Sequence, residues 1–294
     1  MEIRELNYFI AVAECGSISK AAQKLFITQP NLSRQLQKLE EELGQKLLIR
    51  SNKSTELSDA GKLLYKRAKE ITELASKTRE EISSDSGELV GTVSIGGGES
   101  YAVELIARAA KETISDHPGI KFDFFSGDTD AVTDKLDKGL IDFGILIEPS
   151  DLTKYNSLRL PLKDTWGILA RNDSPVAYRS CVTPKDLKDL PLIFSVHSFK
   201  KNAITEWFGI DPEKLNVVAT YNLLYNASLM VKQGIGYAVG LDKIVGTSSD
   251  SGLKFIPFEP KLETHLDVAW KKSTVLSRTS ETFLKYLKNT LAEY

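Results

Sequence analysis

The first 45 residues carry apolar side chains at helical spacing, separated by polar residues. An apolar stripe over 6–13 predicts one helix, and Ser17 is a suitable N-cap for a second helix over 18–25. Thr28 is placed to cap a third helix, in which a proline falls in the first turn, where a missing N–H costs little. Gly44 is suited to the end of that helix. The pattern therefore predicts three short helices.

The third predicted helix has two unlike faces. One face carries leucines at spacings of 4, 3 and 4, which must point to a core. These are Leu32, Leu36, Leu39 and Leu43. The opposite face is polar, with one arginine, and consists of Gln29, Pro30, Ser33, Arg34 and Gln37. Glutamine pairs with adenine and arginine with guanine through two hydrogen bonds. The pattern predicts a helix-turn-helix, and the alternative is a helical bundle with a solvated face.

Two short strands, over 46–50 and 55–57, are predicted around a polar turn at 51–54, which would add a wing to the helix-turn-helix. Charge favours a nucleic-acid partner for this segment. From Ser17 to Lys53 there are seven basic and three acidic residues, a net of +4, although the whole chain has a net charge of −2. Lys53, at the tip of the wing, is placed to enter a minor groove or to touch a phosphate.

A long polar helix is predicted from Asp59 to about Ile82, with Ser58 as its N-cap. Small and apolar residues repeat along it at alternating spacings of 4 and 3, like the seam of a coiled coil. The seam consists of Leu64, Ala68, Ile71, Ala75, Thr78 and Ile82. Because a single helix of this polarity is marginal, the seam predicts pairing with a second copy of the chain. The alternative is packing on the second domain of the same chain. Residues 83–87 read as a hinge.

From residue 89 onwards, apolar runs of strand length alternate with amphipathic helices. Runs at 89–95, 121–125, 143–147 and 166–170 are examples, and the alternation predicts an α/β layer with mostly parallel strands. A glycine-rich turn at 96–98 leads into a helix, which is typical of a generic anion site but matches neither a P-loop nor a dinucleotide fingerprint.

Composition excludes several classes of protein. A length of 294 residues favours about two domains, and 41% hydrophobic with 27% charged residues is ordinary for a soluble globular protein. Two distant cysteines, Cys15 and Cys181, and three scattered histidines offer no disulfide framework and no metal site, and no cofactor is expected. We find no run of about 18 apolar residues and no signal-like N-terminus, so no membrane association is expected and the cytoplasm is the expected compartment.

Residues 1 to about 65 closely resemble the DNA-binding domain of LysR-type transcriptional regulators. The resemblance rests on the motifs AVAE-x-GS, AA-x-x-L, QP-x-x-S-x-Q and LE-x-x-LG, and on AG after the wing. It implies sequence-specific binding of promoter DNA, with base contacts from Gln29, Pro30, Ser33 and Arg34. It also implies an antiparallel pair of linker helices in a homodimer, often within a homotetramer, and makes RNA polymerase a further candidate partner. Lys53 stands where the family wing often has arginine.

The C-terminal region resembles the family's effector domain in layout, with GL-[ID] near 139–142 and QGIGYAVGL at 233–241. The resemblance implies a periplasmic-binding-protein-like fold of two Rossmann-like halves, with a small-molecule effector between them. Strand ends and turns supply the candidate effector-binding residues, for each of which a capping or turn role is the alternative. They are Ser100, Asp128, Thr129, Ser195, His197 and Asn222. The acids Glu99 and Asp128 disfavour a multiply charged anion there.

The expected fold class is an N-terminal all-α winged helix-turn-helix with a long linker helix, followed by an α/β effector domain. The expected boundaries are 1–58, 59–88 and 89–294, with halves made of 89–161 plus 266–294 and of 162–265. The full set of expected DNA-binding residues is Thr28, Gln29, Pro30, Ser33, Arg34, Gln37, Lys38, Arg50 and Lys53.

Other functions compete with that of a ligand-responsive regulator. An architectural DNA-binding protein needs no effector site, and a solute-binding module leaves the N-terminal helices unexplained. A hydrolase built on Ser100, His197 and Asp128 lacks the G-x-S-x-G nucleophile elbow, so the chain is not expected to be an enzyme.

Overall fold

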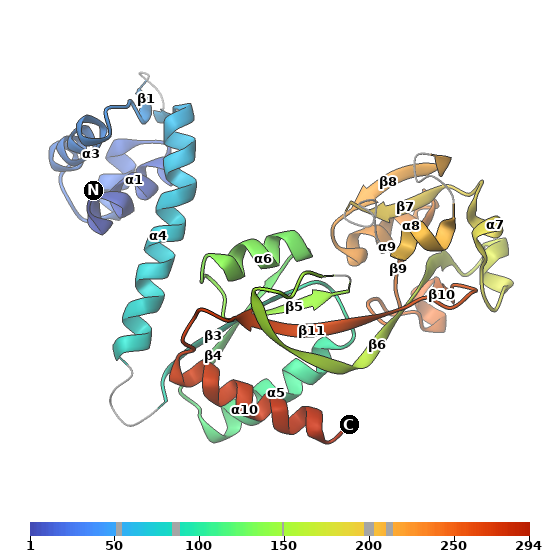
Figure 1. Ribbon diagram of the computed structural model, residues 1–294. Coiled ribbons are helices and arrows are strands. Elements are labelled where there is room, and N and C mark those ends of the chain that lie inside the picture. Colours follow the sequence, from blue (N-terminus) through green and yellow to red (C-terminus); the bar gives the residue numbers. More distant parts are fainter. Residues whose placement is uncertain (51–54, 84–88, 149, 197–202, 210–213) are drawn as a thin grey trace. The chain divides into compact units, whose positions relative to one another are not determined.

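A computed structural model of the chain describes residues 1–50, 55–83, 89–148, 150–196, 203–209 and 214–294 (Figure 1). The chain forms two compact units, residues 1–85 and 86–294. The division falls within the hinge expected from the sequence. The long helix that was expected to link two domains belongs to the first unit.

The first unit confirms the predicted helices and wing strands. Its elements are α1 (Ile3–Cys15), α2 (Ile18–Lys24), α3 (Gln29–Leu43), β1 (Leu48–Arg50), β2 (Thr55–Leu57) and α4 (Asp59–Ser83). Ser17 caps α2, and Ser58 Oγ accepts a hydrogen bond from the Gly61 amide at 3.0 Å. Thr28 occupies the N-cap position of α3 without a side-chain hydrogen bond to the helix. Gly44 ends α3 with a φ of +65°, a conformation that favours glycine.

Helix α4 packs along α1, and this contact corrects part of the predicted coiled-coil seam. Leu64 packs against the core of its own unit, and Ala68 is fully buried. The prediction that the whole seam faces a second helix is therefore wrong for these two residues, because α1 already covers that side. Large apolar side chains remain exposed along α4. They are Leu63, Ile71, Leu74 and Ile82.

The second unit is built on a sheet whose strand order is β4-β3-β5-β11-β6-β9-β7-β8, with β10 paired to β6. The elements of its first half are β3 (Gly91–Gly97), α5 (Val103–Asp116), β4 (Ile120–Ser126), α6 (Thr129–Asp137) and β5 (Phe143–Ile147), joined at the end of the chain by α10 (Arg278–Ala292). The remaining elements are β6 (Tyr155–Arg171), η1 (Pro175–Tyr178), α7 (Pro184–Leu187), β7 (Leu192–Ser195), α8 (Ala203–Phe208), β8 (Val217–Tyr221), α9 (Leu224–Lys232), β9 (Tyr237–Leu241), η3 (Ser249–Ser251), β10 (Leu253–Pro257) and β11 (Glu263–Lys271).

The sheet is mixed, so the expectation of mostly parallel strands is wrong. Strand β3 runs parallel to β4 and β5, and β7 runs parallel to β8 and β9. The long strands β6 and β11 pair antiparallel with each other and with their other neighbours. Strands that carry the chain into the second half and back must run in opposite directions, and this connection was not visible in the local pattern.

Pro161 lies inside β6 rather than at its end. The β6–β11 ladder is irregular between His265 and Asp267, which is where Pro161 would otherwise have to donate a hydrogen bond. The irregularity lets one strand of 17 residues continue through a proline. The expected boundaries between the two halves, after 161 and after 265, lie at this point of the ladder.

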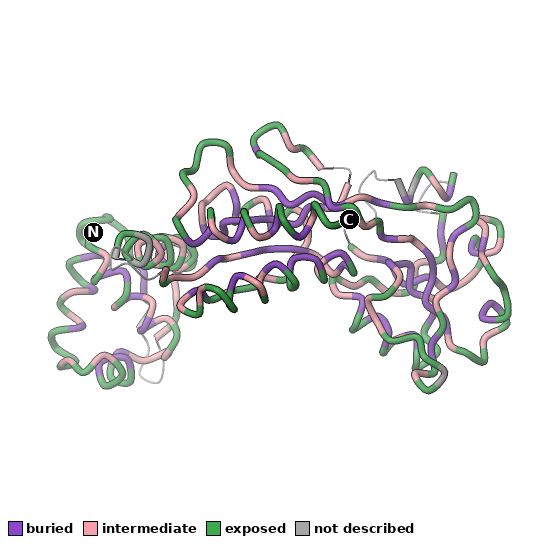
Figure 2. The backbone as a smooth tube through the Cα atoms, turned by 90° about the horizontal axis from the view of Figure 1, so that it is seen from below, coloured by how far each residue is buried: buried purple, intermediate pink, exposed green. Residues whose placement is uncertain are grey.

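Each half has its own hydrophobic core. Phe143 and Phe283 meet edge to face in the first, with ring centroids 5.3 Å apart, and Trp207 stacks on Phe258 in the second at 3.8 Å. Buried positions are concentrated along the strands, and the outer faces of the helices are exposed (Figure 2). The ends of the strands are thus held by two packed bodies that share β6 and β11.

Candidate DNA-binding surface and effector site

The polar stripe of α3 is exposed, and the leucines behind it are buried. Leu32, Leu36 and Leu39 are at most 1% exposed and form part of the core of the unit. On the other face Ser33 is half-buried, and the other predicted contacts are exposed. The exposed ones are Thr28, Gln29, Pro30, Arg34, Gln37 and Lys38. Leu43, expected on the core face, is instead 39% exposed, because α3 ends there.

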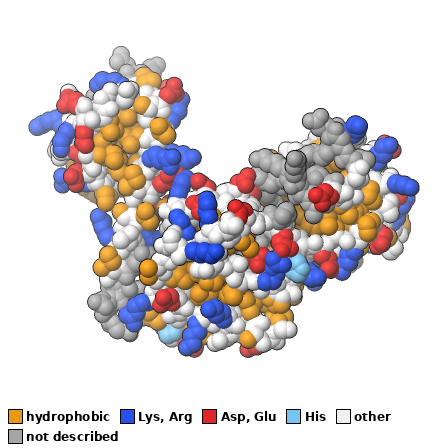
Figure 3. Space-filling view, in the orientation of Figure 1, with side chains coloured by type: hydrophobic (Ala, Val, Ile, Leu, Met, Phe, Trp, Pro, Cys, Tyr) orange, Lys and Arg blue, Asp and Glu red, His pale blue; other side chains and the backbone are white. Residues whose placement is uncertain are grey.

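Charged side chains of the stripe differ in what they contact. Arg34 makes no hydrogen bond or ion pair with any residue in the described part of the chain, so its guanidinium is available to a ligand. Lys38 Nζ instead lies 3.3 Å from Glu5, whose side chain is 3% exposed. The Glu2 amide and Lys38 hold the pKa of Glu5 below its usual value, although burial opposes them. Lysine and arginine side chains are prominent on this unit (Figure 3).

Glu40 ties α3 to the wing and was missed as a functional residue in the sequence. Its side chain is 5% exposed, and Oε1 accepts hydrogen bonds from the amides of Leu47 at 2.8 Å and Leu48 at 3.1 Å. Lys46 Nζ lies 3.0 Å from Oε2. Burial disfavours the charged carboxylate, but these hydrogen bonds outweigh it and lower the pKa of Glu40. The glutamate of the LE-x-x-LG motif was the available signal.

Two of the predicted DNA contacts, Arg50 and Lys53, belong to the wing. Lys53 lies outside the described residues, and of Arg50 only the backbone, in β1, is described.

In the second unit, the predicted effector residues fall into two groups at the carboxyl ends of parallel strands. Gly97 of β3 pairs with Ser126 of β4, so the turns that carry Ser100, Asp128 and Thr129 are neighbours. The other group follows β7 and β8, where Ser195 pairs with Tyr221 and Asn222 comes next. His197 lies outside the described residues.

Two members of the first group already have structural partners. Ser100 Oγ accepts a hydrogen bond from the Ala102 amide at 3.0 Å, and Asp128 caps α6 by accepting one from the Ala131 amide at 2.8 Å. For Thr129, Ser195 and Asn222 the structure shows no side-chain hydrogen bond among the described residues. Thr129 and Ser195 are half-buried and Asn222 is exposed. These three side chains are therefore more available to a ligand than those of Ser100 and Asp128.

Glu99 joins the two groups. Its carboxylate accepts a hydrogen bond from the amide of Leu224, the first residue of α9, two positions after Asn222. Lys243, after β9, places its ammonium 4.5 Å from the ring centroid of Tyr101, after β3. Both contacts link the turns of the first half to those of the second, which sequence reasoning could only expect from the fold family.

Asp164 is a buried acid beside Ser100 that sequence analysis also missed. It is 3% exposed, and its Oδ2 has no hydrogen-bond partner in the described part of the unit. Burial raises the pKa of Asp164, against hydrogen bonds from the Ser100 hydroxyl and the Tyr101 amide and attraction by Lys243. The available signal was period-2 alternation in β6, which puts this acid on the same face as the buried Leu160 and Ile168.

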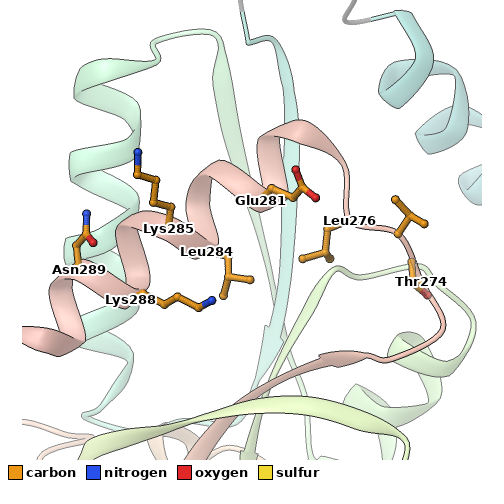
Figure 4. A pocket seen from close by; sticks show the side chains of 8 residues that line it. Thr274, Leu276, Glu281, Leu284, Lys285, Lys288 and Asn289 are labelled. Atoms are coloured by element: carbon orange, nitrogen blue, oxygen red, sulfur yellow. The ribbon is translucent and has the colours of Figure 1, made fainter.

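A separate pocket lies along α10 and the segment before it, and its lining includes none of the predicted effector residues (Figure 4). It has a volume of about 450 Å³. Its lining residues are Thr274, Val275, Leu276, Glu281, Leu284, Lys285, Lys288 and Asn289. In the described ranges, no three or more His, Cys, Asp or Glu side chains are grouped to hold a metal ion. None of the helices in those ranges has the length and apolar character of a membrane span.

Replacing Glu40 with glutamine tests the tie between α3 and the wing. We expect Glu40→Gln to lower the free energy of unfolding by about 1–3 kcal/mol at pH 7, because a charged acceptor of buried amides is lost. The lowered pKa means that this stabilisation is present above the ordinary value of 4.5 and disappears as the pH falls through the folded-state pKa. Urea denaturation followed by circular dichroism, in a pH series from 7 downwards, measures both effects.

Glu41→Gln is the matched control, since Glu41 is exposed and accepts only a surface hydrogen bond from Gln37 at 3.0 Å. If Glu40→Gln lowered the free energy of unfolding by the same amount at every pH, the role assigned to the charge of Glu40 would be contradicted.

Comparison with known proteins agrees with this geometry in both units. The family model for "Bacterial regulatory helix-turn-helix protein, lysR family" matches residues 3–62, and that for "LysR substrate binding domain" matches residues 86–292. The uncharacterized HTH-type transcriptional regulator YvbU of Bacillus subtilis (strain 168) is 28% identical over 81% of each chain. The HTH-type transcriptional regulator AlsR of the same organism is 28% identical over 98% of this chain and 91% of its own.

The solved structure of full-length CbnR complexed with its target DNA has the same fold. Its TM-score is 0.75 at 18% sequence identity, and the match covers 99% of this chain and all of that one. The two family models together cover most of the chain in the order in which its two units occur. The chain therefore belongs to the LysR family of transcriptional regulators, with a helix-turn-helix DNA-binding unit followed by an effector-binding unit.

Proposed function

We propose that this LysR-type regulator reads base edges in the major groove with the stripe formed by Gln29, Pro30, Ser33 and Arg34. The observation that carries the proposal is the exposure of this stripe opposite buried leucines. Thr28, Gln37 and Lys38 extend the proposed contact surface on α3, and Arg50 and Lys53 extend it on the wing. Promoter DNA as the target implies action in the cytoplasm, with RNA polymerase as a further partner.

Replacing Arg34 tests base recognition. We expect Arg34→Ala to relax specificity at one base pair by about 1–3 kcal/mol, because a bidentate contact with guanine is lost. Fluorescence anisotropy at constant salt, on a duplex selected by the protein from a random pool and on its single-base variants, measures this change. Arg67→Ala is the matched control, since Arg67 lies on α4 and pairs with Glu70. A uniform loss on all duplexes would make Arg34 a phosphate contact.

The alternatives explain less of the chain. An architectural DNA-binding protein gives no role to residues 86–292, which match an effector-binding family model. A solute-binding module gives none to the helix-turn-helix at 3–62. We propose regulation without a catalytic step, as in the family's transcriptional regulators.

We further propose that α4 pairs with α4 of a second copy to form a homodimer, which can assemble into a homotetramer. Leu63 and Leu74 lie three turns apart on one side of α4 and are 63% and 42% exposed. Apolar side chains repeated along one side of a helix favour burial against a second helix. Two paired copies would present two recognition helices to successive major grooves.

Leu74→Glu tests this pairing. We expect the change to convert dimers or tetramers into monomers, because a charge would be buried at the contact. Size-exclusion chromatography with light scattering gives the mass in solution. Ser76→Glu adds the same charge at an exposed position on another side of α4 and serves as the control. A Leu74→Glu protein that keeps the wild-type mass would exclude this face of α4 from the interface.

The effector is proposed to bind at the strand ends that carry Ser100, Asp128, Thr129, Ser195, His197 and Asn222. The direct contact between Glu99 and the start of α9 supports this placement, because it draws both groups of turns together. Thr129 and Asn222 are proposed as ligand contacts, whereas Ser100 and Asp128 also maintain local structure.

Asn222→Ala tests the effector site. We expect a metabolite that stabilises the wild-type protein in a thermal-shift screen to bind Asn222→Ala about tenfold more weakly, as for a lost hydrogen bond. The melting temperature without effector should stay unchanged, since the side chain is exposed. Asp128→Ala should instead lower the melting temperature, because α6 loses its cap. Unchanged effector affinity in Asn222→Ala would place the effector elsewhere.

A further inference from the structure

Phe26 is an exposed aromatic residue in the turn between α2 and α3. Its side chain is 96% exposed, the largest exposed fraction among the large hydrophobic residues of the described chain. Its backbone φ is +56°, in the left-handed region that non-glycine residues rarely adopt. Both properties are unfavourable for phenylalanine, which gains most from burial.

The backbone of the turn is fixed by its hydrogen bonds. The Phe26 amide donates to the Gln23 carbonyl at 3.1 Å, and the Ile27 amide donates to the Ala22 carbonyl at 3.0 Å. The neighbours Leu25 and Ile27 pack against the core of the unit, but Phe26 does not. The ring therefore stabilises nothing in the described part of the unit, and glycine or asparagine would fit this backbone better.

The position of Phe26 indicates DNA as the occupant of this surface. The residue lies two positions before Thr28, the N-cap of α3, and three before Gln29, so it continues the exposed stripe at its N-terminal end. In a helix-turn-helix this end of the second helix enters the major groove. Lys20 on α2 is also exposed, whereas Lys24 lies 3.2 Å from Glu14, so Lys20 supplies the positive charge near the turn that a phosphate would bind.

The major groove offers an aromatic ring one apolar base feature, the C5 methyl group of thymine. We propose that the Phe26 ring packs against a thymine methyl group at the edge of the half-site and thereby adds both affinity and a preference for thymine. This inference rests on the proposed function, because it requires the N-terminal end of α3 to lie in the groove.

Phe26→Asn removes the proposed contact of the ring with DNA and keeps a residue that suits the backbone of the turn. Asparagine tolerates the left-handed conformation, so the variant should melt at the same or a higher temperature than the wild type. Its affinity for the selected duplex should fall about tenfold, because the buried ring contact is lost. The slope of affinity against salt concentration should stay unchanged, since no phosphate contact is removed.

Deoxyuridine, which lacks the methyl group, identifies the partner atom. Each thymine of the selected half-site is replaced in turn, and affinity is measured by anisotropy. At one position the wild type should lose about fourfold, the value of one buried methyl group, and Phe26→Asn should lose nothing further. Tyr178→Asn removes another aromatic side chain that is 82% exposed, in the second unit, and should change neither affinity.

Three outcomes overturn the inference. Unchanged affinity of Phe26→Asn for the selected duplex excludes a DNA contact. This holds even if the variant loses promoter activity, since Phe26 would then contact a protein partner. Reduced affinity without coupling to any thymine excludes the methyl contact. A Phe26→Asn protein that melts earlier and loses affinity on random and selected duplexes alike makes the role structural. If the wild type does not discriminate between the selected and random duplexes, the proposed base recognition fails, independently of Phe26.

Discussion

Burial of the leucines of α3 is the constraint on which the DNA-binding unit depends. Leu32, Leu36 and Leu39 face the core, and a helix has only one orientation that buries all three. Each buried leucine side chain is worth about 1.5–3 kcal/mol, which exceeds any preference of the exposed polar residues for one direction. The stripe proposed to read bases is thus oriented by residues that are buried in the core. Glu40 also positions the wing, because its carboxylate accepts hydrogen bonds from the amides of Leu47, just before β1, and of Leu48, the first residue of β1.

The side chains that we propose to contact DNA contribute little to the stability of this unit. Arg34 has no partner in the described chain, and Phe26 combines exposure with an unfavourable backbone conformation. Such costs are tolerated where a ligand supplies the missing contacts. Lys38 differs, because its pairing with the buried Glu5 means that a phosphate would have to compete with a carboxylate for it.

The effector unit has a packed core in each half and polar contacts between the halves. Two packed cores hold the strand ends, and β6 and β11 are the strands that run through both halves. Across the strand ends, the halves touch through Glu99 with Leu224 and Lys243 with Tyr101. These are polar and cation–π contacts, which a ligand with competing groups can replace. At this junction burial raises the pKa of Asp164, whose Oδ2 has no hydrogen-bond partner among the described residues.

Local sequence patterns determined the helices and wing of the first unit, their caps and the two faces of α3, because periodicity and capping act within a few residues. They also determined most strands of the second unit and the grouping of candidate effector residues at strand ends. The packing of Leu64 and Ala68 toward α1, the continuation of β6 through Pro161 and the contact of Glu99 with α9 became visible only in the folded chain. Each of these depends on which distant segment lies opposite, and a one-dimensional pattern records that a side chain is buried without recording its partner.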